Sequence, residues 1–329
     1  MTRIVRFHKT GGPEVLQIDE LEILDPGPDE IQIGIHALGL NRAEAMFRAG
    51  EYVQESVLPG RPGYEAAGRV IKFGKNVSGF NEGDAVSVIP SFNLNDYGVY
   101  GEKANVPASA VTKHPEELGW SKAAALWMQY ITAYGALIDI ANIKTDDIVL
   151  IPAASSSVGL AAIQICKMIG AVPIALTRKS NKREALLKHG AEHVIVTEED
   201  DLVAEVNKIT EGRGANVVFD PVGGEFFSKL TNVMSYQGII FVYGALSPKT
   251  TELSVMDVLG KNLTVRGYQL FEITDDAERL GKAKKFIIDG IKKGLLDPVI
   301  DKVFTLEQMV EAHRYMESNQ QFGKIVVSI

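Results

Sequence analysis

The chain has 329 residues, of which 46% are hydrophobic and 23% are charged, a composition typical of a folded protein large enough for two domains. Its net charge of −8 argues against nucleic acid or an acidic membrane surface as a partner. The single cysteine, Cys166, excludes an internal disulfide and a four-cysteine zinc site, and its apolar neighbours predict a buried thiol.

The first third of the chain consists of short runs with β character, separated by Gly and Pro. Residues 31–38, 67–73 and 84–89 are the clearest of these runs. Up to about residue 121 they predict a small, loop-rich β domain. The first residues lack the apolar stretch of a signal peptide, and no stretch reads as a membrane segment, so we expect a cytoplasmic protein.

Beyond residue 125 apolar strands alternate with stretches of helical length, which predicts a parallel sheet. The six expected strands form a Rossmann, doubly wound sheet and cover residues 147–153, 172–177, 193–196, 216–220, 238–243 and 263–267. Helices are expected at 275–293 and 306–319, and a closing strand at 324–329 returns to the first lobe. We therefore expect a Rossmann nucleotide-binding domain at 126–267, and a β-rich catalytic domain made of 1–125 and 268–329.

A phosphate-binding turn is predicted where the first Rossmann strand meets its helix. The expected Gly-x-Gly-x-x-Gly pattern falls here on Ala154, Ser156 and Gly159, so small residues occupy all three positions. Backbone N–H groups and the positive end of the helix would then meet a pyrophosphate. The predicted contacts are Ala154, Ser155, Ser156, Ser157, Val158 and Gly159. The alternative is that the serines only cap the helix.

The end of the second Rossmann strand predicts the choice of cofactor. An NAD site presents Asp or Glu there to the ribose 2′-hydroxyl, whereas this chain has a basic cluster about twenty residues beyond Gly159. A 2′-phosphate suits such a cluster, so NADPH is favoured over NADH. The predicted contacts are Thr177, Arg178, Lys179, Ser180 and Lys182. The alternative is a solvated basic loop without a ligand.

Several motifs along the whole chain resemble one protein family. They include Gly11-Gly-Pro-Glu-Val-Leu, Pro62-Gly-Tyr-Glu-Ala-Ala-Gly, Asp220-Pro-Val-Gly-Gly and Gly323-Lys-Ile-Val. Together they resemble the medium-chain dehydrogenase/reductase superfamily, in its zinc-free quinone oxidoreductase or zeta-crystallin-like branch. The resemblance implies a GroES-like catalytic domain, NADPH as the cofactor and a homodimer that pairs through edge strands of the nucleotide domain.

The same resemblance predicts that no metal is bound. Zinc-dependent members of the superfamily bind catalytic zinc through a Cys and a His at positions that here hold Asn41 and Tyr64, which are poor zinc ligands. The only close histidine pair, His189 and His193, reads as a helix end and a strand start. Without a Lewis acid, an acceptor that delocalises the incoming hydride charge is favoured over an ordinary alcohol.

The resemblance also assigns residues to the reaction. Tyr52 is expected to be the proton source or hydrogen-bond donor to the reduced oxygen, with Asn41 as an orienting donor. The alternative is that Tyr52 only lines the pocket, with its hydroxyl satisfied by the protein. Further cofactor contacts are expected from residues around the nicotinamide and from the closing segment, namely Gln129, Thr132, Tyr134, Tyr243, Gly244, Asn319 and Lys324. Asp220 fits a strand-ending turn better than an acid catalyst.

These observations predict an NADPH-dependent oxidoreductase that passes a hydride to a small-molecule quinone or α,β-unsaturated carbonyl. One alternative is a zinc-free aldehyde or alcohol oxidoreductase, which would share every cofactor feature. The other is a non-catalytic NADPH-binding protein with a structural or sensory role. The acceptor pocket is expected in loops 51–59, 93–100 and 269–273, whose residues carry no recognisable code.

Overall fold

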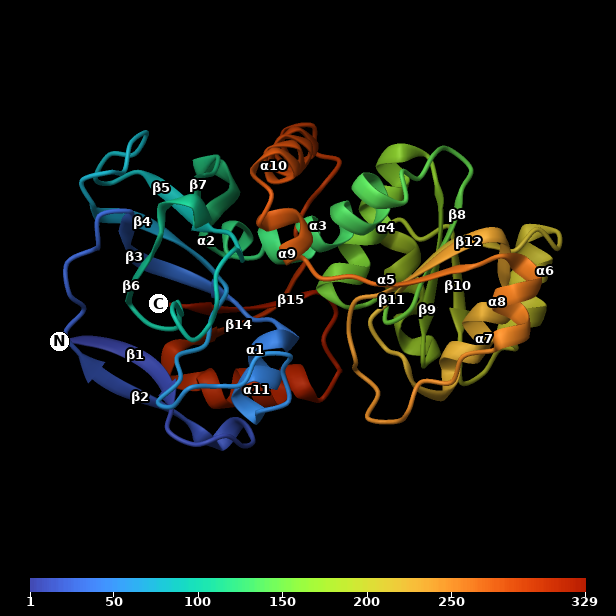
Figure 1. Cartoon of the computed structure of the whole chain (residues 1–329), viewed down its shortest axis with the longest axis horizontal. Coiled ribbons are helices and arrows are strands. Elements are labelled where there is room, and N and C mark those ends of the chain that lie inside the picture. The colour runs from blue at the N-terminus through green and yellow to red at the C-terminus, as the bar shows by residue number, and fades with distance from the viewer. The chain divides into compact units, whose positions relative to one another are not determined.

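The computed structural model describes residues 1–329, and the chain divides into two compact units (Figure 1). One unit comprises Met1–Met128 and Pro298–Ile329, and the other comprises Gln129–Asp297. The predicted α/β class, with a β-rich unit and a parallel-sheet unit, is confirmed. None of the helices is both long enough and apolar enough to span a bilayer.

The first unit contains a seven-stranded sheet in the order β14-β15-β3-β4-β5-β7, with β6 paired to β3, and a separate antiparallel pair β1-β2. The strands are β1 (Thr2–Phe7), β2 (Leu16–Leu21), β3 (Glu30–Gly39), β4 (Glu65–Phe73), β5 (Ala85–Val88), β6 (Lys103–Pro107), β7 (Val111–Lys113), β14 (Ile300–Thr305) and β15 (Lys324–Ser328). The helices are α1 (Arg42–Ala49), α2 (Gly119–Ala123) and α11 (Met309–Glu317), with the short η1 (Pro13–Val15), η2 (Ala108–Ala110), η3 (Glu116–Leu118) and η7 (Leu306–Gln308). The three strands predicted in this region are confirmed.

The closing strand does return to the first unit, as predicted. β15 pairs antiparallel with β3, where Val327 faces Leu38, and parallel with β14, a strand that the sequence pattern did not reveal. The sheet is tightly packed at this end: a Cβ atom on Gly39 would lie 2.0 Å from the carbonyl oxygen of Ala124. Only a glycine allows that approach, so β3 ends directly against the alanine-rich segment after α2.

The second unit is built around a six-stranded parallel sheet in the order β10-β9-β8-β11-β12-β13, which is the Rossmann order. The strands are β8 (Ile148–Ile151), β9 (Val172–Thr177), β10 (His193–Val196), β11 (Ala215–Asp220), β12 (Met234–Val242) and β13 (Thr264–Gly267). All six predicted strands are therefore present. Figure 1 shows helices on both sides of this sheet.

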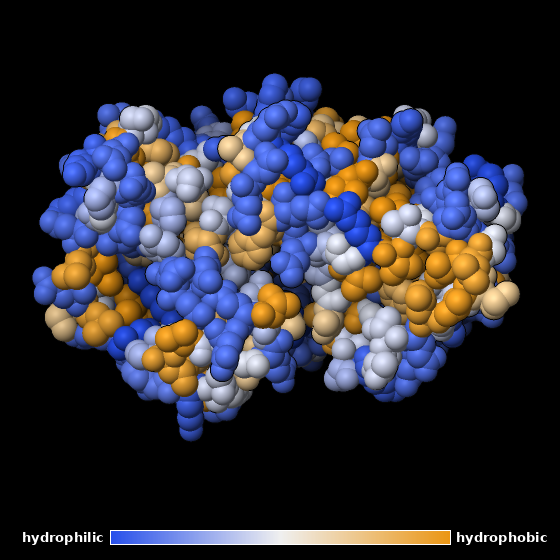
Figure 2. Space-filling view, viewed as in Figure 1, coloured by the Kyte–Doolittle hydropathy of each residue, from blue (hydrophilic) through white to orange (hydrophobic).

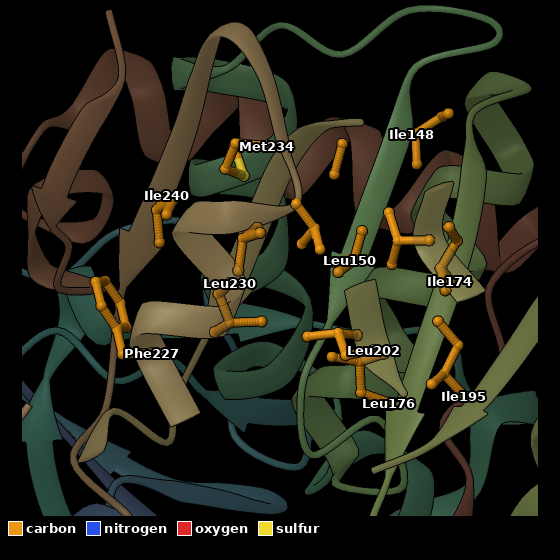
Figure 3. Packing of buried hydrophobic residues seen from close by; sticks show 14 of the residues in the cluster. Ile148, Leu150, Ile174, Leu176, Ile195, Leu202, Phe227, Leu230, Met234 and Ile240 are labelled. Atoms are coloured by element: carbon orange, nitrogen blue, oxygen red, sulfur yellow. The ribbon is translucent and has the colours of Figure 1, made fainter. Parts of the chain in front are cut away.

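The helices of this unit are α3 (Trp127–Tyr134, which begins in the first unit), α4 (Ser157–Ile169), α5 (Arg183–Lys188), α6 (Leu202–Thr210), α7 (Phe227–Asn232), α8 (Val255–Lys261), α9 (Phe271–Thr274) and α10 (Ala277–Lys292). Shorter helical turns are the π-helix η4 (Gly135–Ile140), η5 (Ser180–Lys182) and η6 (Gly224–Phe226). Apolar side chains of the strands, including Leu150 and Ile174, meet side chains of α6 and α7, including Leu202 and Leu230 (Figure 3). Cys166 on α4 is buried as predicted, and burial raises the pKa of its thiol.

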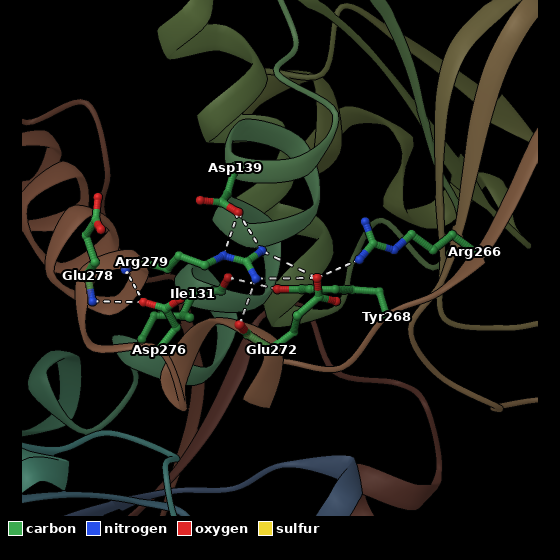
Figure 4. Close-up of polar contacts among 8 residues, drawn as sticks. All are labelled: Ile131, Asp139, Arg266, Tyr268, Glu272, Asp276, Glu278 and Arg279. Carbon is green, nitrogen blue, oxygen red and sulfur yellow. Dashed lines mark hydrogen bonds and ion pairs between the residues drawn. The ribbon is translucent and has the colours of Figure 1, made fainter.

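The boundary of the second unit differs from the predicted one at its C-terminal end. Residues 268–297 belong to the second unit, not to the catalytic domain. Arg279 on α10 forms an ion pair with Asp139 of the π-helix at 2.5 Å and with Glu272 of α9 at 3.4 Å (Figure 4). Arg266 of β13 binds the same Glu272 at 2.5 Å. The amphipathic pattern of α10 predicts the helix but not the unit that covers its apolar face.

Candidate functional site

The turn between β8 and α4 has the geometry of a phosphate-binding turn. Ser156 is the N-cap of α4, and its Oγ accepts the backbone N–H of Gly159 at 3.1 Å. A Cβ on Gly159 would lie 2.6 Å from the carbonyl oxygen of Ala154, so the turn is closed as tightly as a glycine permits. The remaining first-turn N–H groups have no partner within the helix and are available to an anion.

The predicted basic residues gather next to this turn. Lys182 donates from Nζ to the Oγ of Ser155 at 3.0 Å, so two predicted contacts from different loops meet. Arg178 and Lys179 are exposed at the end of β9 and form no ion pair within the chain. The cluster thus places cations beside the first helical turn, where an NADPH 2′-phosphate fits better than an uncharged ribose hydroxyl.

An acidic residue missed by the sequence analysis also reaches this place. The Oε1 of Glu199, which follows β10, accepts the backbone N–H of Ser180 at 3.2 Å. It therefore occupies a donor that a phosphate oxygen would use. No local motif could have revealed it, because Glu199 and Ser180 approach each other only through the pairing of β9 with β10.

The carboxyl ends of β11 and β12 lie on the same edge of the sheet as the turn. The ring of Tyr243 stacks on Phe219 at 3.9 Å, and its hydroxyl is buried without a hydrogen-bond partner. Such an orphan hydroxyl fits a polar group of a bound molecule. A Cβ on Gly244 would lie 2.8 Å from the carbonyl oxygen of Pro221, which again requires a small residue.

Asp220 has the structural role that was expected of it. Its carboxylate is fully buried and accepts the backbone N–H groups of Val222 and Gly223, each at 2.9 Å. Burial raises the pKa of this carboxyl, and the two hydrogen bonds partly oppose that rise. Asp220 therefore holds the turn after β11. Gln129 and Thr132, also predicted as cofactor contacts, are buried on α3.

A buried polar cluster in the first unit surrounds Asn41, the N-cap residue of α1. The amide nitrogen of Asn41 lies 3.1 Å from the carbonyl oxygen of Gly39 and 3.2 Å from carboxylate oxygens of both Glu44 and Glu65. Its Oδ1 accepts from Nζ of Lys324 at 2.6 Å. The amide of Asn41 is therefore hydrogen-bonded within the protein, and its expected role as an orienting donor stays a prediction.

Lys324 is almost completely buried, and no other lysine or arginine of the chain is less exposed. Its ammonium forms an ion pair with Glu65 at 2.5 Å, and both side chains are 1% exposed. Asn319, the other predicted contact from the closing segment, has a left-handed backbone (φ 58°) and accepts from Arg42 at 2.5 Å. Each of these two residues therefore has a structural partner inside the first unit, whatever else it binds.

Glu44 is the most heavily hydrogen-bonded carboxylate of this cluster. It accepts from the backbone N–H of Asn41 at 2.6 Å, the backbone N–H of Tyr64 at 2.8 Å, the hydroxyl of Tyr100 at 2.8 Å and the Asn41 amide. Burial raises the pKa of Glu44, and these hydrogen bonds and the charge of Lys324 act against the rise. The carboxylate links α1, the start of β4 and the segment before β6.

Tyr52 and Tyr64 lie beside each other at the edge of the cluster. Tyr52 follows the C-cap of α1, Gly50, whose φ of 80° turns the chain out of the helix. Burial raises the pKa of Tyr52, and the Tyr64 hydroxyl, which hydrogen bonds to it, partly lowers it again. Tyr52 thus remains a protonated phenol with a polar neighbour, as a proton donor requires.

Two of the loops expected to form the acceptor pocket are tied together. Asn95 accepts the backbone N–H of Val57 at 2.9 Å and donates to the carbonyl oxygen of Glu55 at 2.8 Å. Gln54 also donates to Asn93. Hydrogen bonds with Asn93 and Asn95 therefore fix the position of loop 51–59, which carries Tyr52.

Glu44, Glu65, Tyr100 and His313 are the site residues that the sequence analysis missed. One signal was available: Asn41 followed three residues later by Glu44 matches the capping-box pattern at a helix start. His313 lies on the buried side of α11 together with Met309, Ala312 and Met316, which is the spacing of a core position. No group of three or more His, Cys, Asp or Glu side chains in residues 1–329 is arranged to hold a metal ion.

Comparison with known proteins agrees with this arrangement. The family model described as "Alcohol dehydrogenase GroES-like domain" matches residues 27–152, and that described as "Zinc-binding dehydrogenase" matches residues 157–285. Among relatives, the chain is 31% identical to human quinone oxidoreductase over 329 residues, covering 99% of this chain and 98% of the relative. It is also 31% identical to the synaptic vesicle membrane protein VAT-1 homolog of Rattus norvegicus, covering 92% and 77%.

A solved structure shows the same fold. The Escherichia coli quinone oxidoreductase complexed with NADPH superposes with a TM-score of 0.92 at 30% identity, covering 99% of this chain and all of that one. The chain therefore belongs to the medium-chain dehydrogenase/reductase superfamily. Within it, the chain is a member of the quinone oxidoreductase branch, and it is an oxidoreductase.

Proposed function

We propose that the protein is a zinc-independent, NADPH-dependent oxidoreductase that reduces quinones or α,β-unsaturated carbonyls. The observation that carries the proposal is the meeting of the phosphate-binding turn after β8 with the basic end of β9, through the hydrogen bond from Lys182 to Ser155. The E. coli relative was crystallised with NADPH. In this chain, Arg178 and Lys179 would hold the 2′-phosphate, and the first turn of α4 would hold the pyrophosphate.

The other predicted cofactor contacts are part of the same proposal. Tyr243 would offer its orphan hydroxyl to the bound molecule, and Gly244 would allow it to approach the end of β12. Gln129, Thr132 and Asn319 keep the roles that the family resemblance implies. Bound NADPH would supply the hydride.

The proposal of zinc independence rests on the ammonium of Lys324. It binds Asn41, which stands at a zinc-ligand position of the zinc-dependent relatives, and the adjacent Glu65. A cation already fills this site, and a second cation beside it would be repelled at short range. An amide and a phenol are also poor zinc ligands. We expect elemental analysis of the purified protein to give no stoichiometric zinc, and one zinc per chain would contradict this part of the proposal.

The acceptor class follows from the available donors. Without a metal to stabilise an alkoxide, the substrate must spread the charge of the incoming hydride over a conjugated system. Tyr52 then donates its Oη proton to the reduced oxygen, and the acceptor gains one hydride and one proton. The hydrogen bond from Tyr64 stabilises the phenolate that is left on Tyr52.

The test is NADPH oxidation with a panel of quinones, enones and aldehydes, repeated with NADH. Turnover of quinones or enones with NADPH supports the proposal. Turnover only of aldehydes, or of alcohols in reverse, would replace it with the zinc-free alcohol oxidoreductase. Tight NADPH binding without any turnover would identify a non-catalytic binding protein.

The variant Tyr52→Phe tests the proton donor. We expect its kcat to fall by roughly 10²-fold or more, with little change in NADPH affinity, because one phenol oxygen is lost from the acceptor site. Tyr236→Phe is the matched control, since Tyr236 is exposed at the start of β12. An unchanged kcat for Tyr52→Phe would remove Tyr52 from the mechanism.

We also propose that the protein is a homodimer that pairs through β13 and α8. β13 is an edge strand of the Rossmann sheet, with free hydrogen-bonding groups on one side. An apolar patch lies over this region (Figure 2), and the exposed apolar side chains on and near α8 and β13 are Leu253, Val255, Met256, Leu259 and Val265. A sheet edge beside an apolar patch suits a second copy of the same surface.

Light scattering after gel filtration tests the dimer. Leu259→Lys places a charge in the centre of the patch, and we expect it to yield monomers. Leu24→Lys is the control, because Leu24 is similarly exposed but lies in the first unit. A wild-type monomer, or a dimer unaffected by Leu259→Lys, would rule out this interface.

A further inference from the structure

Three buried residues form a hydrogen-bonded chain that ends on Glu44. Nη1 of Arg48 lies 3.0 Å from Nδ1 of His313, and Nε2 of His313 lies 3.2 Å from the hydroxyl of Tyr100, which lies 2.8 Å from Oε2 of Glu44. Arg48, His313 and Glu44 are at most 2% exposed, and Tyr100 is fully buried. Neither the fold nor the proposed reaction by itself requires so many buried polar groups.

The direction of each hydrogen bond in this chain is fixed by chemistry. A guanidinium only donates, so Nδ1 of His313 must accept from Arg48. Burial and the neighbouring Arg48 charge lower the His313 pKa to about 3, so the ring is neutral and carries its proton on Nε2. Nε2–H therefore donates to the oxygen of Tyr100, and the Tyr100 hydroxyl donates to Glu44. All three donors point the same way, towards the carboxylate.

The chain ends on a buried carboxylate: burial raises the pKa of Glu44, and its hydrogen bonds and the charge of Lys324 oppose that rise. Glu44 receives four hydrogen bonds, two of them from backbone N–H groups, and carboxylates with several such donors favour the ionised form. The groups that face it are Asn41 from its own helix, Tyr64 and Glu65 from the start of β4, Tyr100, Lys324 from β15, and Tyr52. Aligned hydrogen bonds in a buried site reinforce one another.

Glu44 connects this chain to the proposed proton donor. It holds the backbone of Tyr64, whose side chain hydrogen bonds to Tyr52. The negative charge of Glu44 also acts to raise the Tyr52 pKa, so the anion serves the reaction by holding Tyr64 and Tyr52 in place and not by making the phenol a stronger acid. A neutral Glu44 would lose both this charge and one or more of its accepted hydrogen bonds.

We propose that Glu44 is a positioning residue that acts as an anion, and that the chain Arg48–His313–Tyr100 keeps it ionised in its buried place and thereby sets Tyr64 and Tyr52. This rests on the proposed function, in which Tyr52 gives a proton to the acceptor. Neither Glu44 nor the three residues of the chain touch the reacting atoms. These residues fix the position of the proton donor Tyr52 and leave the proposed reaction unchanged.

The test is the pH dependence of kcat between pH 5 and 9 with a quinone acceptor. Tyr100→Phe removes one hydrogen bond to the anion, so the Glu44 pKa rises and the anionic form is lost at a higher pH. We expect the acid limb of the Tyr100→Phe profile to move up by about one pH unit, with NADPH affinity unchanged. Tyr315→Phe is the matched control, because Tyr315 is on the same helix as His313 and donates to Asp301 at the surface.

Glu44→Gln completes the test, because its neutral amide removes the anion that the chain Arg48–His313–Tyr100 is proposed to stabilise. Adding Tyr100→Phe to Glu44→Gln should then shift the profile no further. A Tyr100→Phe variant with kcat lowered by the same factor at every pH would overturn the proposal, since the chain would then be only structural.

Stability provides a readout that does not depend on turnover. Because the extra destabilisation of Tyr100→Phe comes from an ionised Glu44, its Tm deficit should be larger at pH 8 than at pH 5. An equal deficit at both pH values would contradict the anionic role. If the wild-type protein reduces no acceptor, the proposed function fails, but this stability comparison still decides the role of Glu44.

Discussion

The ion pair between Lys324 and Glu65 shows how much a single residue matters in this site. Both side chains are 1% exposed, so either one alone would be an uncompensated buried charge. We expect Lys324→Met to lower the free energy of unfolding at neutral pH by about 3–5 kcal/mol.

Urea unfolding of Lys324→Met at pH 7 measures this effect. The double variant Glu65→Gln with Lys324→Met should recover part of the stability, because the Glu65 carboxylate is then no longer buried without its partner. Lys282→Met, which breaks an exposed pair with Glu278 on α10, is the control and should be close to wild type. A loss in Lys324→Met no larger than in the control would show that the pair contributes little.

Glu199 predicts a second effect at the residue scale. Its carboxylate occupies the backbone N–H of Ser180 and lies among the cations proposed to bind the 2′-phosphate. Glu199→Gln removes a negative charge there, so we expect the ratio of NADPH to NADH affinity to rise several-fold. The double variant Arg178→Ala with Lys179→Ala should lower the same ratio at least tenfold. Fluorescence titration with both cofactors measures it, and a ratio that does not respond to either change would refute the 2′-phosphate site.

At the scale of elements, the turn between β8 and α4 depends on the absence of one side chain. A Cβ at Gly159 would meet the backbone of Ala154 at 2.6 to 2.8 Å, where nothing flexible can move aside. We expect Gly159→Ala to open the turn, to weaken NADPH binding by tenfold or more and to lower Tm. Gly281→Ala on α10 is the control, because its Cβ would meet nothing within 4 Å, and it should raise stability by about 0.5–1 kcal/mol.

The elements that could be predicted from the sequence are those with a local signal. The strands β9 and β10 end where predicted, because buried parallel strands are continuous apolar runs bounded by turns. β14 was not predicted, since Ile300–Thr305 is largely exposed and its adjacent Asp and Lys break the alternation that marks a half-buried strand. The unit predicted for α10 was also wrong, because the ion pair that ties this helix to the second unit joins Arg279 to Asp139, 140 residues away in the sequence.

The residues of the candidate site also divide into those with a local sequence signal and those without one. The phosphate-binding turn lies within six consecutive residues, so its pattern is visible in the chain itself. The buried cluster is not local: Asn41 and Lys324 are 283 residues apart, and Tyr100 and His313 are 213 apart. In the sequence, a buried polar residue with a distant partner cannot be distinguished from a surface residue. Only the folded sheet brings the two partners together.

At the scale of the whole molecule, the two units differ in how the chain builds them. The second unit is continuous, Gln129–Asp297, and has its own sheet, core and ion-pair network. We therefore expect the fragment 129–297 to fold alone and to bind NADPH with measurable affinity. Circular dichroism and cofactor titration of the fragment check this. The fragment 1–128, which lacks β14 and β15, should not fold, and an unfolded 129–297 fragment would show that the units depend on each other.

The position of β15 has a consequence for the growing polypeptide. The strand lies between β3 and β14 and carries the ammonium that neutralises Glu65, yet it is made only after the whole second unit. While the ribosome synthesises the second unit, the sheet of the first 128 residues lacks β15. The carboxylate of Glu65 cannot yet be buried with its partner. The first unit is thus completed only after the second unit has been synthesised, and until then it is the part of the nascent chain that chaperones would have to protect.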